Sequence, residues 1–196
     1  MLQVPQKWQI LCEAFVSLSI VLPPTVLGFY LLMILGADSP LGPLVTSFND
    51  GAGLIFTFEG LVVGSCFYSL PFVFQPIMNA YLAIPNQAFK LAATLGLNPF
   101  QRFYRVGIPL AWKGIVTGGI LGFAHTMGEF GVVLMIGGNI PGETRVVSVA
   151  IYDYVETLDY ASAHRLSLIL LGISFVCLFA VGMLNRKRRS SSHAFY

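Results

Sequence analysis

Long apolar runs separated by short polar segments dominate this chain. Four runs come close to the length of about 20 residues that a helix needs to cross a bilayer: 15–35, 61–78, 115–136 and 166–184. Prolines interrupt the first two runs, at Pro23-Pro24 and at Pro71 and Pro76, and predict kinks there because each removes a backbone donor. The third run is rich in glycine, which favours close helix packing. The pattern predicts an all-α integral membrane protein, a polytopic helical bundle with four spans.

Two shorter helical features lie between the third and fourth runs. Residues 146–155 are mildly amphipathic, which is typical of a helix lying at the membrane interface. Asp159 is expected to cap the helix that becomes the fourth span.

Composition and charge placement support a multi-pass membrane protein. The chain is 56% hydrophobic and 10% charged, and its mean hydropathy of +0.75 leaves too little charged surface for a soluble domain. Basic residues gather in the loop 85–113 and in the tail 186–196, whereas Asp38, Asp50 and Glu59 lie in 36–59. Because basic loops stay on the cytoplasmic side, we expect both termini to be cytoplasmic. The interpretation is one transmembrane domain, 1–185, in the plasma (inner) membrane, followed by a basic cytoplasmic tail.

The loop 85–113 is the longest polar interruption with basic character. It carries Lys90, Arg102, Arg105 and Lys113 and no acidic residue. Pro85 and Gly96 bound a predicted short helix, since proline suits the first turn and glycine suits the left-handed position after the last. Its Ala88, Leu91, Ala92 and Leu95 fall on one helical face. We expect this helix to dock on a cytoplasmic partner.

The same loop carries a recognisable pattern of small residues, glycine and proline. Ala92 is followed by Gly96 and then by Val106, Ile108 and Pro109. This arrangement resembles the coupling-helix motif of ATP-binding-cassette (ABC) importer permeases. Three other segments, 20–24, 128–131 and 139–145, resemble the molybdate permease family in order and spacing. The similarity extends from about Val4 to the fourth span.

The resemblance implies a set of partners. A permease of this family is a homodimer, two cytoplasmic ABC ATPase subunits drive it, and an external binding protein delivers the oxyanion. It implies no cofactor and no bound metal. The ATPase-coupling residues are then Lys90, Leu91, Ala92, Gly96 and Pro109.

The chain departs from the family pattern in three respects. Lys90 stands where an acidic residue is usual, and Leu91 stands where a small residue is common. The family also has at least one more spanning helix before the Pro-Pro helix. A late start site or a truncated, inactive subunit therefore stays open as an interpretation.

A group of residues in the first and third runs is expected to form the translocation pathway or its gate: Pro23, Pro24, His125, Gly128, Glu129 and Gly131. An acid inside a span is costly and normally faces protein or a watery cavity. Glu129 is therefore either a gate near the outer mouth or a carboxylate satisfied by backbone donors or by Arg145. His125 either presents a donor to a passing anion or forms a hydrogen bond between helices. Direct contact between Glu129 and an anionic cargo is not expected.

Glu143 and Arg145 are assigned to the outer mouth. Arg145 either attracts anions there or pairs with Glu143. The terminal Arg/Lys cluster is expected to meet anionic membrane lipid, and no nucleic-acid partner is expected because no folded basic surface with stacking aromatics is present.

The sequence lacks the motifs of several enzyme classes. The sequence has no Gly-rich Lys-Ser/Thr phosphate loop and no His-Glu-x-x-His, so ATP hydrolysis belongs to a separate subunit. The leading hypothesis is a molybdate importer permease, with sulfate, tungstate or another oxyanion as alternative cargo. A proton-coupled secondary transporter is the alternative from another class.

Overall fold

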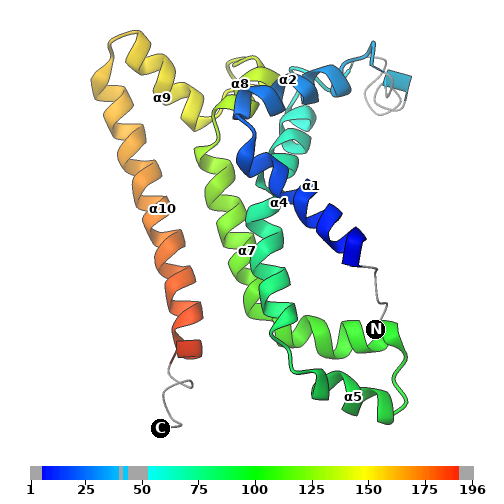
Figure 1. The fold of residues 1–196 in the computed structure, drawn as a ribbon. Coiled ribbons are helices and arrows are strands. Elements are labelled where there is room, and N and C mark those ends of the chain that lie inside the picture. The colour runs from blue at the N-terminus through cyan, green and yellow to red at the C-terminus, as the bar shows by residue number, and fades with distance from the viewer. Residues whose placement is uncertain (1–5, 40–41, 44–52, 190–196) are drawn as a thin grey trace.

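The computed structural model describes residues 6–39, 42–43 and 53–189, and within these ranges the fold is all-α without strands (Figure 1). Asp50 and residues 190–196 of the basic tail lie outside the described residues. The helices are α1 Gln6–Val21, α2 Pro24–Leu35, α4 Phe58–Leu82, α5 Asn86–Thr94, α6 Pro99–Arg102, α7 Ile108–Gly128, α8 Gly131–Gly137, α9 Val147–Glu156 and α10 Tyr160–Arg189.

Among the described residues, three helices are long and apolar enough to cross a membrane. They are Phe58–Leu82, Pro99–Gly128 and Tyr160–Arg186, and the count becomes four if the bent pair α1 and α2 is one span. The predicted kinks at Pro71 and Pro76 do not break α4, which continues through both prolines. Pro71 is fully buried, and opening the backbone in an apolar interior would expose polar groups without any partner.

The first predicted span, 15–35, is wrong as a single kinked helix. α1 and α2 meet at 118°. The residue before a proline is pushed out of the helical region, and Pro23 accordingly has an extended backbone with φ −54° and ψ 136°. Pro24 then starts α2, where its missing N–H costs nothing. The dipeptide thus ends one helix and begins another.

The third predicted span, 115–136, is also wrong at both ends. Its helix is continuous from Pro99, and it stops at Gly128 because Glu129 is extended. α8 begins two residues later and packs against α2, where Leu31, Leu35, Val132 and Ile136 form a buried cluster.

Glycines bring α4 and α7 into close contact, as the sequence predicts. A Cβ added to Gly114, Gly118 or Gly122 would lie 2.3 to 2.6 Å from atoms of α4. The three glycines are four residues apart and share one helix face. Gly119, on another face, would meet nothing within 4 Å.

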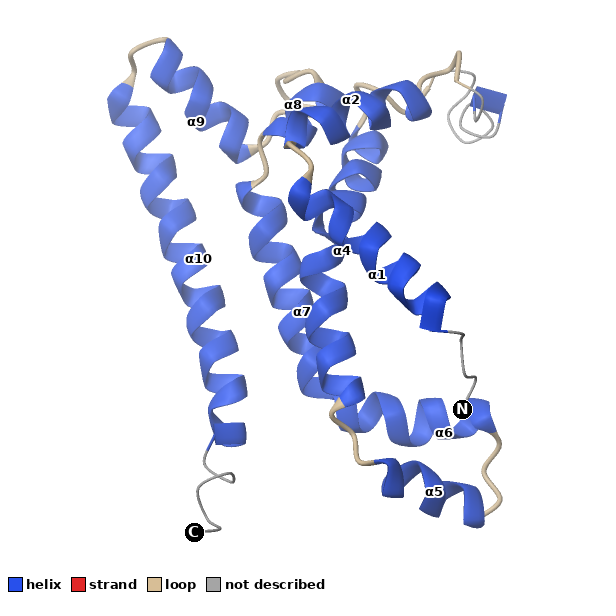
Figure 2. Ribbon diagram, viewed as in Figure 1, coloured by secondary structure: helices blue, strands red, loops and turns tan. Residues whose placement is uncertain are grey.

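The helices define two ends of the molecule (Figure 2). α5 and α6 lie at one end of α4 and α7, which we call the coupling end. α2, α8 and α9 lie at the opposite end, which we call the far end. α10 packs against α7 and α9, and no residue of its most apolar stretch is buried. Asp159 caps it as predicted, because its Oδ1 accepts a hydrogen bond from the Ser162 N–H at 3.1 Å.

Candidate coupling surface and translocation site

α5 is the helix that the proline and glycine signals predict. It spans Asn86–Thr94, with Pro85 at its N-cap. Gly96 has φ +81°, a conformation that is cheap only for glycine. The chain closes the helix there, since Leu97 N–H donates to the Ala92 carbonyl at 3.1 Å.

The residues that share one face of α5 in the sequence pattern differ in exposure in the structure. Phe89 and Ala92 are buried, whereas Leu91 and Leu95 are 66% and 74% exposed. Phe89 packs in a cluster with Ile84 and Ala111, at the ends of α4 and α7. The leucines are therefore free to contact another protein, while the opposite face attaches α5 to the two long helices.

Aromatic side chains extend the exposed apolar surface beyond α5. Phe100, Phe103 and Tyr104 are all exposed, and the rings of Phe100 and Tyr104 lie 4.7 Å apart. We call these three residues, together with Leu91 and Leu95, the coupling surface, after the role that the sequence predicts for this loop. An exposed apolar group of this kind is typical of a protein contact, and Lys90 lies beside it, also exposed.

A π-helical turn joins α6 to α7. It spans Phe103–Gly107, and the Ile108 N–H donates to the carbonyl of Phe103, five residues back. Pro109 follows in the first turn of α7, where its ring would clash with a regular α-helical carbonyl four residues earlier. Gly107 allows the Tyr81 ring of α4 to approach, since a Cβ would lie 2.8 Å from it.

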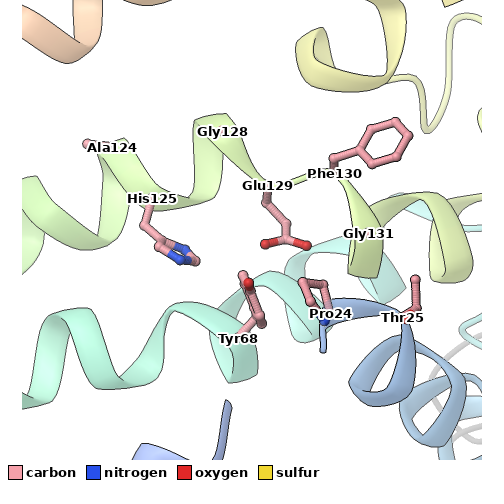
Figure 3. A pocket seen from close by; sticks show the side chains of 9 residues that line it. All are labelled: Pro24, Thr25, Tyr68, Ala124, His125, Gly128, Glu129, Phe130 and Gly131. Carbon is pink, nitrogen blue, oxygen red and sulfur yellow. The ribbon is translucent and has the colours of Figure 1, made fainter. Parts of the chain in front are cut away.

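The far end holds a cavity of about 540 Å³. Its lining brings together five of the six predicted pathway residues: Pro24, His125, Gly128, Glu129 and Gly131. Pro23 is not among the lining residues. Figure 3 shows the His125 and Glu129 side chains directed into the same space as Tyr68 of α4.

Glu129 is held by backbone donors. It is 4% exposed, and its Oε1 accepts a hydrogen bond from the Val132 N–H at 2.8 Å. Its backbone carbonyl accepts from the Ser148 hydroxyl. The carboxylate thus supports the first turn of α8, as the second of its two interpretations expects, and a gating role stays a prediction.

His125 connects α7 with α4. Its Nδ1 lies 3.3 Å from the Ser69 hydroxyl, and its ring stacks on Phe72 at 3.7 Å between centroids. Ser69 also bonds Thr126 at 2.7 Å. This is the helix–helix interpretation of His125, and a role toward anions stays a prediction.

Of the two interpretations of Arg145, the pairing with Glu143 is wrong, and a role toward anions stays a prediction. Its guanidinium lies 2.8 Å from Asp153 Oδ2 and donates to Asn139 Oδ1 at 3.0 Å. Asn139 in turn donates to the same Asp153 oxygen. The reason is local geometry: Asn139 and Gly142 both have positive φ, and the resulting turn directs Arg145 toward α9. Arg145 fastens the loop 139–145 to that helix.

The comparison with protein families decides the class of this chain. The family model described as "Binding-protein-dependent transport system inner membrane component" matches residues 3–190. The chain belongs to this family. It is therefore a multi-pass membrane subunit of a transport system and not an enzyme.

Curated relatives of this permease carry more specific descriptions. The molybdenum transport system permease protein ModB of Azotobacter vinelandii is 55% identical over 168 residues, which cover 86% of this chain and 74% of the relative. ModB of Escherichia coli (strain K12) is 32% identical over 182 residues, covering 91% and 78%. The sulfate permease protein CysT of Synechococcus elongatus is 33% identical over 174 residues, covering 89% and 62%.

Four residues of the permease cavity are absent from the sequence-based prediction: Thr25, Tyr68, Ala124 and Phe130. Phe130 and Thr25 adjoin predicted residues, so the motifs 20–24 and 128–131 are a signal for them. Tyr68 has no such signal, because the run 61–78 is apolar on all sides and does not indicate which face meets α7.

Proposed function

We propose that this chain is the membrane-spanning subunit of an ABC importer for molybdate. The observation that carries the proposal is the 55% identity, over most of the chain, to a molybdenum transport permease. The sulfate permease protein CysT of Synechococcus elongatus, at 33% identity, is less similar than this relative, which favours molybdate over sulfate. The permease works as a homodimer with two ATPase subunits and an external binding protein.

The coupling surface supports the ATPase contact. Two ATPase subunits require two coupling helices, and each copy of the chain supplies one α5. Leu91 and Leu95 are exposed on α5, and we infer that they enter a groove of the ATPase. The coupling end then lies on the cytoplasmic side of the membrane. The far end, with its cavity, lies on the external side.

A mechanical path connects the two ends. Phe89 of α5 packs in one cluster with Tyr81 of α4 and Ala111 of α7, so that a push on α5 reaches both long helices. The glycine face of α7 packs directly on α4, so we infer that the pair moves as one body. At the far end α7 stops at Glu129, next to the break between α1 and α2. These two breaks are the points where the far end is able to open and close while the long helices tilt.

Reconstituted transport tests this function. The permease, its ATPase and its binding protein are placed in liposomes, and uptake of labelled molybdate is measured with and without ATP. We expect uptake that requires ATP and the binding protein, that excess tungstate reduces, and that excess sulfate leaves unchanged. Uptake driven by a proton gradient without ATP would contradict the proposal and indicate a secondary transporter. Stronger competition by sulfate than by molybdate would contradict the assigned cargo.

A further inference from the structure

A second cavity lies at the coupling end and takes no part in the proposed pathway. It has a volume of about 450 Å³ and lies between α4, α7 and the last turns of α10. Its lining includes Asn79, Ala80, Leu110, Lys113, Thr117 and Asn185.

The cavity has polar side chains and no acidic one among its lining residues. Lys113 brings a positive charge, and the side-chain amides of Asn79 and Asn185 bring donors as well as acceptors. A positive charge without an acidic neighbour suits a ligand that carries an anionic group.

The lining of this cavity combines polar and apolar side chains, as the headgroup and chains of a phospholipid require. Apolar residues such as Leu110 and Leu184 line the same cavity, and the unburied face of α10 leads from it along the membrane. The sequence continues directly from Asn185 into four basic residues, 186–189.

We propose that this cavity binds the phosphate of an anionic phospholipid, with Lys113 as the charged contact and the side-chain amides of Asn79 and Asn185 as neutral donors. Basic pockets between helices at this depth are suited to such headgroups. The assignment to the cytoplasmic leaflet rests on the orientation proposed above, whereas the binding itself does not. The bound lipid joins the end of α10 to the α4–α7 pair.

Lipid binding to the full chain tests the proposal. The protein is purified in detergent, stripped of lipid and titrated with phosphatidylglycerol or phosphatidylcholine, and bound lipid is counted by native mass spectrometry. Both lipids carry a phosphate, but the choline of phosphatidylcholine balances its charge, whereas phosphatidylglycerol has a net negative charge. We therefore expect phosphatidylglycerol to bind about five-fold more tightly, the effect of one basic side chain on an anionic lipid. Lys113→Gln should remove that preference. Asn79→Ala should weaken the binding of both lipids, because its amide serves the phosphate that both carry.

Arg165→Gln is the matched control, because it removes one positive charge from the other end of α10 and should leave the preference unchanged. Equal binding of the two lipids, or equal effects of Lys113→Gln and Arg165→Gln, would overturn the proposal. So would displacement of the lipid by millimolar inorganic phosphate, which would identify a site for a soluble anion. A change of oligomeric state without a change in lipid preference would assign the cavity to a second copy of the chain. None of these measurements needs ATPase or molybdate, so the lipid-binding results can be interpreted even if the transport assay fails.

Discussion

Removing the two exposed leucines of α5 should weaken ATPase binding strongly. Leu91 and Leu95 are 66% and 74% exposed, so most of each side chain is available to be buried by a partner. Full burial of a leucine contributes about 1.5–3 kcal/mol, which gives about 1–2 kcal/mol for each of these side chains. The double variant Leu91→Ala/Leu95→Ala should therefore lose about 2–4 kcal/mol, or roughly 30- to 1,000-fold in Kd.

The assay is a direct Kd measurement between the ATPase and the permease in lipid nanodiscs. Phe89 and Ala92 remain in the double variant, so α5 keeps its attachment to α4 and α7. Leu158→Ala is the matched control, because Leu158 is 70% exposed at the far end and should leave the Kd unchanged. A double variant that binds the ATPase as tightly as the Leu158→Ala protein would refute the assignment of the coupling surface.

Three further predictions concern stability, measured by thermal unfolding in detergent. Gly118→Ala should destabilise the protein by about 1–3 kcal/mol, since its Cβ would lie 2.6 Å from a backbone carbonyl of α4. Gly119→Ala should stabilise the protein slightly, because alanine has the higher helix propensity. Equal effects of the two substitutions would contradict the packing of Gly118 on α4. Glu129→Ala should lower the stability of the protein by about 1–3 kcal/mol, because it leaves a buried α8 N–H unpaired. Glu129→Gln keeps an acceptor and should lower the stability less. The reverse order would contradict the role of the Glu129 carboxylate in the first turn of α8. Hydrogen bonds from Ser162 lower the pKa of Asp159, so its stabilising effect is complete above the ordinary Asp pKa and is lost as the pH falls through the lowered value. Asp159→Ala should therefore reduce the acid sensitivity of stability, and an unchanged pH profile would contradict this.

Local signals predict the coupling helix well. Pro85 and Gly96 act on their own backbone, one through a fixed φ and the other through a permitted positive φ, and the observed helix ends close to both. Which side of the helix is buried depends on Tyr81 and Val106 of neighbouring segments. The sequence therefore predicts the helix but not the exposure of Leu91.

The far end is harder to predict because hydropathy does not detect a break inside an apolar run. Residues 115–136 form one continuous apolar stretch in which only Glu129 is acidic. The break there depends on α8 turning onto α2, where Gly131 approaches Pro24 so closely that a Cβ would lie 2.7 Å from it. The prolines predict a kink at Pro23-Pro24, but the sequence does not give its angle of 118°, because that angle depends on how α2 packs against α8.

The candidate cavity is predicted in part for the same reason. Motif residues such as Glu129 and Pro24 are identified by their chemistry, and tertiary contacts bring them together. Tyr68 comes from a helix whose apolar surface has no preferred face, so its position depends on the glycine contacts between α4 and α7.

The central claim is that ATP binding in a separate subunit moves α5 and thereby the long helices. The most direct measurement is the distance between spin labels on Gln87→Cys in the two copies, after replacement of Cys12, Cys66 and Cys177 by serine. Gln87 is exposed on α5 and lies outside the coupling surface, so the label leaves that surface intact. In the complex with ATPase, we predict a distance that changes when ATP is added and stays constant when the ATPase is left out. A distance that ATP leaves unchanged in a complex that still transports molybdate would contradict the account.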